Sequence, residues 1–461
     1  MVKQQQKKTA TFVVLVSVGI AMSLGGTRQA WAQATPCQPG QELITIPEIK
    51  SNDQGILRAE IRLTSGQRTL WGSVGDTRCV PQALRYFTGR DLLKPGSKED
   101  KAFAQGEPLP GPTLRAKVGD LIQIKFLNHV DTQEFANSLD QASTNPANTT
   151  GCDEVRSNTG LIYPTGGDTY PNCLHGSSTT NLHFHGTHTT PDTTGDNVLL
   201  FVRPALRSGP DRKTIEPKTA FVDKTFERIF SACEQEGSPT RWGALPDAWR
   251  KEQERLLKKY DRTAPYQGQS GNLPKDMRLW PVNARQIASG VWPQYQIGAY
   301  PYCFRLADAS SNRMGQSPGT HWYHAHKHGS TALNVANGMT GAFVIEGQYD
   351  VDLRTFYGQD FRDQVLVIQQ LSSTPFPLLN PATQGPNSVP KPQLSVNGRL
   401  NPIVKMRPGE VQLWRIVNGA FRDAVQLQSF TPQGGRRGDR SRRMACSSPT
   451  RTTPPWAPRT T

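Results

Sequence analysis

The sequence has few long apolar segments, and after its first thirty residues none could cross a bilayer, which takes about 20 apolar residues. We therefore expect no stable membrane anchor. The longest apolar run, from Phe12 to Leu24, is short for such a span. Lysines precede this run, and Ala30-Trp31-Ala32 follows it as a small-x-small cleavage site. This order predicts a signal peptide over residues 1–32 and an exported protein, periplasmic or extracellular.

A concentrated basic surface is also missing, although the net charge is +15. Much of the excess lies in two terminal segments. Residues 1–32 carry basic residues and no acid, and residues 435–461 carry seven arginines against one aspartate. The small remainder is dispersed along the rest of the chain, which is typical of an ordinary solvated surface. The composition therefore predicts no nucleic-acid partner.

Cysteine is scarce, and no cysteine stands beside a histidine in a metal-ligand arrangement. Six of the seven cysteines lie in the body of the predicted exported chain, which allows up to three disulfides. The sequence does not determine their pairing. The cysteines are Cys37, Cys79, Cys152, Cys173, Cys233, Cys303 and Cys446.

Short alternating segments separated by turn residues dominate the chain. Leu114–Val118 and Ile122–Phe126 fit half-buried strands joined by a turn, and this pattern predicts an all-β sandwich. The pattern of apolar and polar residues changes between residues 202 and 316. There Asp247 is a candidate N-cap for a helix that carries Trp249, Leu256, Leu257 and Tyr260 at helical spacing. We expect a partly helical insertion.

The last third of the chain returns to strand patterns before they stop. Asn397-Gly398 is a tight-turn signal, and Val411–Val417 alternates as a strand does. Together they predict the opening of a second sandwich domain. After about Gly434 almost nothing apolar remains, so we expect a disordered or out-of-frame tail.

Two histidine clusters stand out from the nine histidines. Because strand side chains alternate, His183 and His185 share one face, and so do His324 and His326. One such pair alone is often no more than an exposed pair of polar residues. Two pairs in one exported β-rich chain favour a metal. Neutral imidazole suits copper, and zinc is the competitor that the spacing leaves open.

The clusters occur in a wider pattern that resembles the multicopper oxidase family. Asn181-Leu182-His183-Phe184-His185-Gly186 and the stretch Gly319–Gly347, GTHWYHAHKHGSTALNVANGMTGAFVIEG, look like the first two copper motifs of that family. Gly111–Asp120 is similar to its N-terminal strand pair, and 396–418 to the opening of its second domain. The resemblance covers about residues 40–430 apart from the insertion.

The resemblance implies a cupredoxin-like Greek-key β-sandwich. It places the first cupredoxin domain at 33–350, with the insertion at about 202–316. An incomplete second cupredoxin domain follows at 351–432, and the tail occupies 433–461.

The same resemblance implies roles for individual histidines. His183 would be the type 2 copper ligand, and His185, His324 and His326 would bind the paired type 3 coppers. His321 and His328 flank these ligands and need not bind, and we expect three others to be structural or surface residues: His129, His175 and His188. The acids Asp192 and Asp196 follow the first motif, as surface acids or as groups that deliver protons beside the metal.

Laccase-like oxidases of this family couple the copper-dependent oxidation of a small-molecule or metal-ion reductant to the reduction of O2 to water. The chain departs from the pattern, because the sequence shows no histidine after His328 and no type 1 site. We therefore expect an incomplete trinuclear site and doubtful activity for the chain alone. A non-catalytic exported copper-binding protein, or one half of a split oxidase completed by a second chain, are the alternatives.

Overall fold

The structure is a computed structural model. It describes a set of segments between 39 and 425: 39–72, 78–104, 106–131, 178–189, 191, 194–208, 213–236, 245–263, 265–266, 269–270, 295–308, 315–327, 330–373, 392–422 and 425. The predicted signal peptide and the predicted tail lie outside these segments. Among the described helices, none has the length and apolarity needed to cross a membrane.

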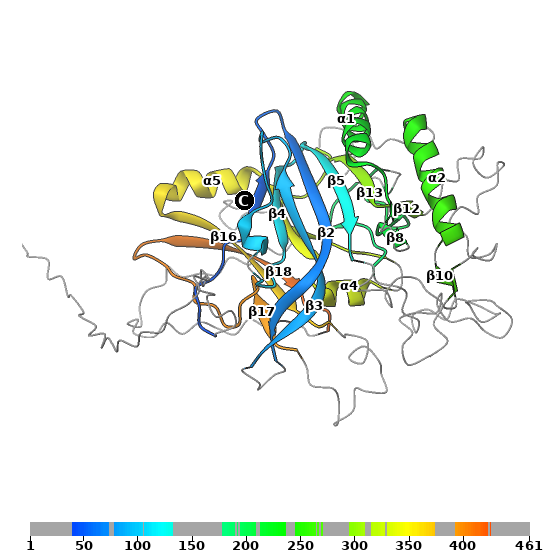
Figure 1. Cartoon of the computed structure of the whole chain (residues 1–461). Coiled ribbons are helices and arrows are strands. Elements are labelled where there is room, and N and C mark those ends of the chain that lie inside the picture. The colour runs from blue at the N-terminus through cyan, green and yellow to red at the C-terminus, as the bar shows by residue number, and fades with distance from the viewer. Residues whose placement is uncertain are drawn as a thin grey trace, which may run out of the picture. The chain divides into compact units, whose positions relative to one another are not determined.

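Two sheets face each other across the main core (Figure 1). The first has the strand order β1-β4-β15-β14-β6, and the second has the order β13-β5-β2-β3. The strands of the first sheet are β1 Glu48–Lys50, β4 Gly111–Lys117, β6 His183–His185, β14 Gly319–His324 and β15 Thr340–Glu346. Those of the second are β2 Ile56–Trp71, β3 Cys79–Asp91, β5 Leu121–His129 and β13 Ala299–Arg305.

The apolar alternation of these strands explains how the sheets pack. Ile122, Ile124 and Phe126 of β5 point into the core, where they meet Leu114 of β4 and Phe343 of β15. Each of these side chains is fully removed from water, and burial of a large apolar side chain contributes about 1.5–3 kcal/mol. The chain passes repeatedly from one sheet to the other, so distant segments become neighbours. The prediction of an all-β sandwich is confirmed.

Two long helices lie beside the second sheet. Helix α1 Thr219–Glu236 packs on β13 and β5, and helix α2 Asp247–Thr263 packs mainly on the short strands β9 Lys213–Ile215 and β12 Tyr295–Ile297. Phe226 and Phe230 of α1 and Trp249 of α2 pack against residues of β5 and β13. Figure 1 shows α1 beside these two strands. A disulfide joins Cys233 of α1 to Cys303 of β13. The predicted helix is present, although Asp247 is its first residue and the carbonyl of Pro246 accepts the first helical hydrogen bonds.

The inserted region differs from the sequence-based expectation in two respects. Helix α1 was not anticipated, although Val222, Phe226, Ile229 and Phe230 follow helical spacing. In addition, β13 lies within 202–316 and yet forms an edge of the sandwich, where it pairs with β5 along its whole length. The remaining short strands of this region are β7 Phe201–Arg203, β8 Leu206–Ser208, β9 Lys213–Ile215, β10 Pro265–Tyr266, β11 Gln269–Ser270 and β12 Tyr295–Ile297.

A third sheet, in the order β17-β16-β18, begins the second predicted domain. Its strands are β16 Phe361–Gln370, β17 Leu394–Val396 and β18 Val411–Gly419. Asn397 and Gly398 both have positive φ, of 48° and 77°, as the tight-turn prediction requires. Val365, Val367 and Val417 of this sheet pack on the outer face of β15. The third sheet therefore covers part of the first sheet.

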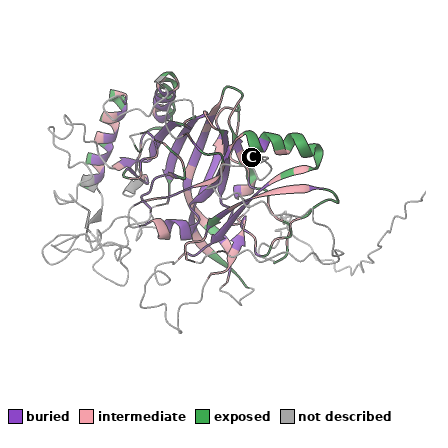
Figure 2. Cartoon of the chain, turned by 180° about the vertical axis from the view of Figure 1, so that it is seen from behind, coloured by how far each residue is buried: buried purple, intermediate pink, exposed green. Residues whose placement is uncertain are grey.

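Shorter helical elements lie between the described strands. α4 Thr331–Asn337 lies between β14 and β15, and α5 Gln348–Tyr357 leads through the 3-10 turn Gly358–Asp360 into β16. Another 3-10 turn covers Lys101–Ala104. Figure 2 shows that buried residues concentrate in the sheets, whereas α5 is largely exposed.

Candidate metal centre

The two histidine clusters lie on adjacent strands. β6 is an edge strand that pairs antiparallel with β14, and His324 stands opposite His183 while Trp322 stands opposite His185. Directly opposed residues of an antiparallel pair point to the same face. His183, His185 and His324 therefore share the outer face of the first sheet, away from the core that Phe184 and Tyr323 occupy.

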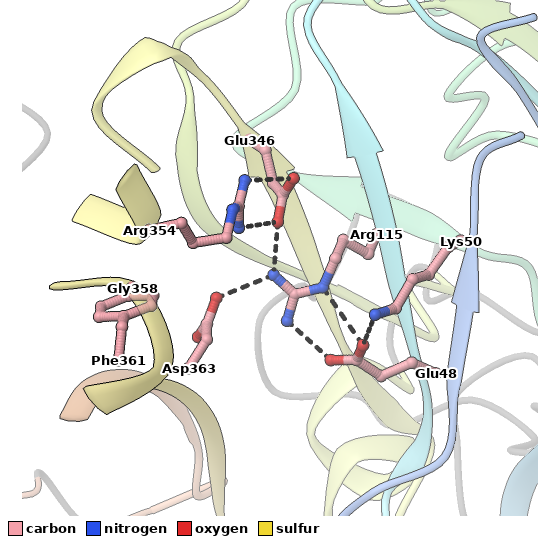
Figure 3. Close-up of a pocket in the computed structure, with 8 residues that line it drawn as sticks. All are labelled: Glu48, Lys50, Arg115, Glu346, Arg354, Gly358, Phe361 and Asp363. Atoms are coloured by element: carbon pink, nitrogen blue, oxygen red, sulfur yellow. Dashed lines mark hydrogen bonds and ion pairs between the residues drawn. The ribbon is translucent and has the colours of Figure 1, made fainter. Parts of the chain in front are cut away.

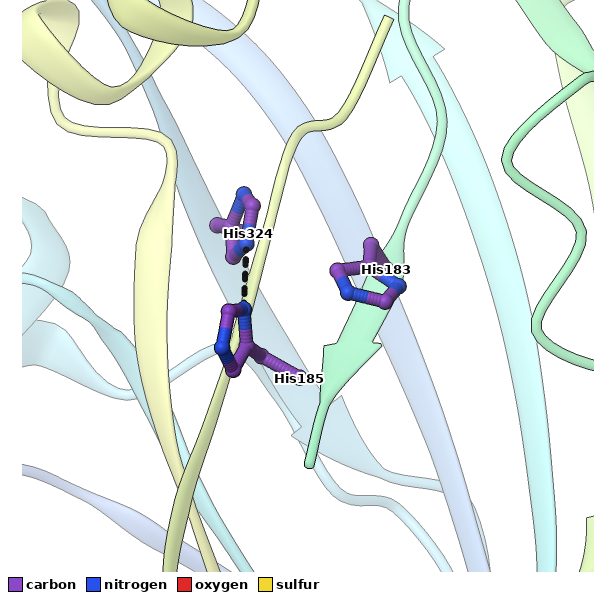
Figure 4. Close-up of side chains that lie close together, drawn as sticks. All are labelled: His183, His185 and His324. Atoms are coloured by element: carbon purple, nitrogen blue, oxygen red, sulfur yellow. Dashed lines mark hydrogen bonds between the residues drawn. The ribbon is translucent and has the colours of Figure 1, made fainter. Parts of the chain in front are cut away.

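The rings of the four predicted ligands are close together. The ring centroid of His183 lies 5.5 Å from that of His185, 5.2 Å from that of His324 and 4.8 Å from that of His326. The ligand nitrogens of His183, His185 and His324 all lie within 4.8 Å of one another, and Figure 4 shows these three rings. Between His324 Nε2 and His185 Nδ1 the distance is 3.4 Å. The structure thus brings the four residues together, although they come from segments 139 positions apart.

Burial keeps part of this cluster neutral. Removal from water, followed by the repulsion of the neighbouring histidines, lowers the pKa of His324 to about 3. Desolvation, with the charges of His183 and His326, also lowers the pKa of His185. Neutral imidazole is the form that binds a metal. At neutral pH His324 and His185 therefore favour the neutral form, which presents nitrogen lone pairs.

Asp196 contacts the first histidine of the cluster. Its carboxylate lies 2.9 Å from His183 Nδ1, and it also accepts a hydrogen bond from Phe184 N at 2.9 Å. A carboxylate on Nδ1 favours the tautomer with a proton there and leaves Nε2 available to a metal. Asp196 is thus one of the two acids predicted from the sequence, and the other, Asp192, lies outside the described residues.

A steric constraint explains why the first motif ends with a glycine. Gly186 has a φ of +84°, which L side chains rarely adopt, and an added Cβ would lie 2.7 Å from His321 Nδ1. The His321 ring in turn contacts the Ser317 carbonyl through Nε2 at 3.0 Å. His321 therefore packs over the turn that follows the cluster. His188 is exposed and contacts the Gly315 carbonyl, and His129 ends β5 in the other sheet. His175 and His328 lie outside the described residues.

Two residues that the sequence analysis did not single out hold the clustered segment. The hydroxyl of Tyr302, on β13, accepts a hydrogen bond from Leu182 N at 2.9 Å, and burial raises the pKa of this phenol. Asn181 is also fully buried and contacts the segment that carries His326. Tyr302 has no sequence signature, and Asn181 opens the first histidine motif without a role assigned to it, because each acts on backbone groups that only the fold brings near.

Trp322 lies at the boundary between the histidines and the third sheet. Its ring is stacked on that of His324 with centroids 4.1 Å apart, and it also packs against the cluster formed by β15, β16 and β18. The outer face of the first sheet is therefore divided into two regions. The histidines lie on β6 and β14, and apolar side chains lie where the third sheet covers the face. This packing restricts the orientation of the His324 ring.

The donor set fits a copper or zinc ion better than a hard cation. Four neighbouring imidazoles offer nitrogen ligands, whereas magnesium and calcium require mainly oxygen ligands. Asp196 is engaged with His183 Nδ1 and Phe184 N. His183, His185 and His324 are thus placed as a group that could hold a metal ion, and the ring of His326 lies beside them.

A charged pocket of about 380 Å³ lies between β1, β4, β15 and α5 (Figure 3). The guanidinium of Arg115 fills its centre and is paired with Glu48, Glu346 and Asp363 at 2.7–2.9 Å. Arg354 and Lys50 complete the pairing of the glutamates. Each acid already has a basic partner. We therefore interpret these ion pairs as contacts that hold β16 to the first sheet.

No protein-family model matches the chain. Among curated proteins, a segment of 115 residues is 30% identical to the cell division protein FtsP of Sodalis glossinidius and covers 24% of each chain. A segment of 105 residues is 29% identical to the multicopper oxidase mco of Staphylococcus aureus and covers 23% of each chain.

Among solved structures, a multi-copper oxidase from Pediococcus acidilactici aligns at 11% identity with a TM-score of 0.36, over 86% of this chain and 48% of that one. A variant of the McoA multicopper oxidase of Aquifex aeolicus aligns at 13% identity with a TM-score of 0.33, over 83% and 46%. The chain thus matches about a quarter of the length of these curated relatives and under half of these structures.

The sheets and the histidine cluster define a β-sandwich protein with a group of imidazoles on one outer face. Such a protein is similar to multicopper oxidases, and the resemblance predicted from the histidine motifs is confirmed by the curated oxidase that matches the chain.

Proposed function

We propose that His183, His185, His324 and His326 bind copper as one half of the trinuclear centre of a laccase-like multicopper oxidase. In this proposal His183 is the type 2 ligand, and the other three bind the type 3 pair. The observation that carries it is the convergence of four rings, three on one face of the first sheet and that of His326 just beyond the end of β14, with centroids 4.8–5.5 Å from that of His183. The match to a curated multicopper oxidase supports copper as the metal.

The reaction that follows from this proposal is the oxidation of a small-molecule or metal-ion reductant with O2 as acceptor and water as product. Copper supplies the one-electron chemistry when it is bound. The residues of this chain orient the imidazoles, with Asp196 on His183 and Trp322 on His324. A trinuclear centre takes more ligands than these four, and the remainder would come from a further domain or from a second chain.

Export to the periplasm or the extracellular space belongs to the same proposal. The disulfide between Cys233 and Cys303 supports it, because disulfides persist mainly in oxidising compartments. Both cysteines are fully buried. A mass-spectrometric determination of the N-terminus of the secreted protein would test cleavage after Ala32.

A second candidate is a copper-binding protein without turnover. Four imidazoles are sufficient to hold a single metal ion, and one of the two curated relatives is named for cell division and not for oxidation. In this candidate the copper site serves retention of the ion, and no reductant or O2 is needed.

Turnover of the copper-loaded protein separates the candidates. Both predict tight, stoichiometric copper retention in competition with zinc, abolished by His183→Ala together with His324→Ala. His188→Ala, an exposed histidine after β6, is the matched control and should retain copper. O2 consumption with a phenol or ferrous iron, restored by a co-purified partner, would favour the oxidase. Retention without turnover in every preparation favours the second candidate, and zinc retention in preference to copper contradicts both.

A further inference from the structure

A buried amide lies beside the histidine cluster and has no part in the sequence-based assignment. Asn181 precedes His183 by two residues and is fully removed from water. Its Oδ1 accepts a hydrogen bond from His326 N at 2.8 Å. Its Nδ2 donates to the carbonyl of Val198 at 3.0 Å and to that of His326 at 3.4 Å. One side chain thus binds both backbone groups of His326.

The sheet itself does not hold His326. β14 ends at His324, whose partner on β6 is His183, so the ladder stops two residues before His326. Ala325 N donates to the carbonyl of Met339 at 3.2 Å, and the Ala325 carbonyl contacts His324 Nδ1 at 2.9 Å. At the next residue, both the N–H group and the carbonyl of His326 contact the Asn181 side chain.

We propose that Asn181 is a positioning residue that fixes His326 against His183 as the fourth imidazole of the copper site. This inference rests on the proposed function. The amide also ties both histidine segments to Val198, in the loop that carries Asp196. One buried side chain therefore connects three parts of the site, namely the strand with His183, the segment with His326 and the loop with Asp196.

The chemistry of this position requires an amide. The side chain must accept from one N–H group and donate to two carbonyl oxygens, and only a carboxamide offers both functions at this length. A carboxylate would keep the acceptor but would face two carbonyl oxygens. Alanine would remove all of these contacts and leave buried backbone groups without them, which costs about 1–3 kcal/mol.

Asn128 provides a matched control. It too is a fully buried asparagine, and its Nδ2 donates to the carbonyls of Ser178 and Val202, each at 2.8 Å. Its Oδ1 accepts from Val130 N at 3.3 Å. It lies on β5 in the other sheet, and none of these contacts involves a histidine. Asn128→Ala therefore removes a comparable set of buried hydrogen bonds without touching the site.

The experiment compares Asn181→Ala, Asn181→Asp and Asn128→Ala in the full chain, with and without Cu²⁺. In the metal-free protein, NMR hydrogen exchange of the His326 amide should accelerate at least tenfold in Asn181→Ala. It should stay slow in Asn181→Asp, which keeps the acceptor, and in Asn128→Ala. With one equivalent of Cu²⁺, Asn181→Ala should lose one nitrogen coupling in the EPR spectrum and bind about tenfold more weakly.

Two results would overturn the proposal. One is an unchanged exchange rate of the His326 amide in Asn181→Ala, and the other is an equal loss of copper affinity in Asn181→Ala and Asn128→Ala. If Asn181→Ala fails to fold, Asn181→Asp still tests the acceptor, since loss of amide protection in that variant contradicts the assignment. Failure of the unmodified protein to bind copper would contradict the proposed function alone, because the exchange measurement needs no metal.

Discussion

At the scale of single residues, the site depends on contacts that orient imidazole rings. Asp196 accepts from Phe184 N and lies 2.9 Å from His183 Nδ1, so it fixes both the backbone and the ring of the β6 segment. Trp322 restricts the orientation of the His324 ring by stacking on it. Such contacts around a ligand are commonly worth a factor of about 10–100 in metal affinity.

We predict that Asp196→Asn weakens Cu²⁺ binding by about tenfold, because the amide no longer supplies a charged acceptor for His183 Nδ1. Titration against a chelator measures the affinity, and thermal unfolding without metal measures the stability. Asp91→Asn is the control, since Asp91 is a buried acid on β3 whose contacts are with Leu93 N and Lys94. Equal copper affinities for Asp196→Asn and the unmodified protein would show that Asp196 does not contribute to metal binding.

The glycines of the second motif also act at this scale. Tyr323 donates to the carbonyl of Pro112 at 2.8 Å, and its ring lies over Gly341, where an added Cβ would come within 2.2 Å of the ring. Gly341 faces Tyr323 directly across the β14–β15 pair.

Gly341→Ala should therefore lower the free energy of unfolding by about 1–3 kcal/mol, the usual cost of an overpacked core. Urea unfolding measures this change. Gly66→Ala, a strand glycine whose added Cβ would lie 3.4 Å from the Tyr86 hydroxyl, is the control and should change little. A Gly341→Ala protein as stable as the control would show that the Tyr323 ring moves without cost.

At the scale of elements, helix α1 is tied to the sandwich by packing and by a covalent bond. Phe226 and Phe230 pack on β5 and β13, and the disulfide joins Cys233 to Cys303 across 70 residues of sequence. Backbone groups of Cys303 also pair with Thr194, two residues before Asp196. The helix thus supports the strand that supports the Asp196 loop.

Removal of this disulfide by Cys233→Ala together with Cys303→Ala should lower the free energy of unfolding by about 2–4 kcal/mol. The physical reason is that the open chain regains the conformational entropy of a long loop when it unfolds. Urea midpoints measure the loss. The unmodified protein in a reductant strong enough to open the bond should shift in the same direction, and an unchanged midpoint in both would show that the packing of α1 suffices.

At the scale of the whole molecule, buried acids paired with bases determine acid stability. Glu60 lies between Arg62, Arg90 and Lys125 at 2.6–3.0 Å. Burial alone would raise its pKa, but the hydrogen bond from Arg90 and the charge of Lys125 outweigh it and lower the pKa to about 2. The same balance, with Arg115 as the main partner, lowers the pKa of Glu48.

A lowered pKa in the folded state stabilises the protein at pH values above the unfolded-state pKa. The contribution of Glu60 is therefore present above about pH 4.5 and is lost as the pH falls toward 2. We predict a steep loss of unfolding free energy in this interval. Glu60→Gln should be less stable at pH 7 and show a shallower dependence on pH. Partly exposed Glu254, paired with Lys258 on α2, provides the control Glu254→Gln, which should follow the unmodified protein.

The sequence by itself determined the sandwich, the tight turn at Asn397-Gly398, the α2 helix and the histidines that the strands bring to one face. These follow from local periodicity, because a strand alternates its side chains and a turn with positive φ favours Asn and Gly. Helix α1 was not predicted, although its apolar residues follow helical spacing. No sequence pattern indicated that β13, within the predicted insertion, is a strand of the sandwich.

Tertiary structure alone decided which neighbours hold the histidines. The pairing of β6 with β14 sets His183 opposite His324. The packing of the two sheets brings the Tyr302 hydroxyl, on β13, to the backbone N–H of Leu182, just before β6. Asn181 reaches His326 across 145 positions of sequence. Such contacts join a side chain to a distant backbone group, and a backbone group has no residue identity that a sequence pattern could reveal.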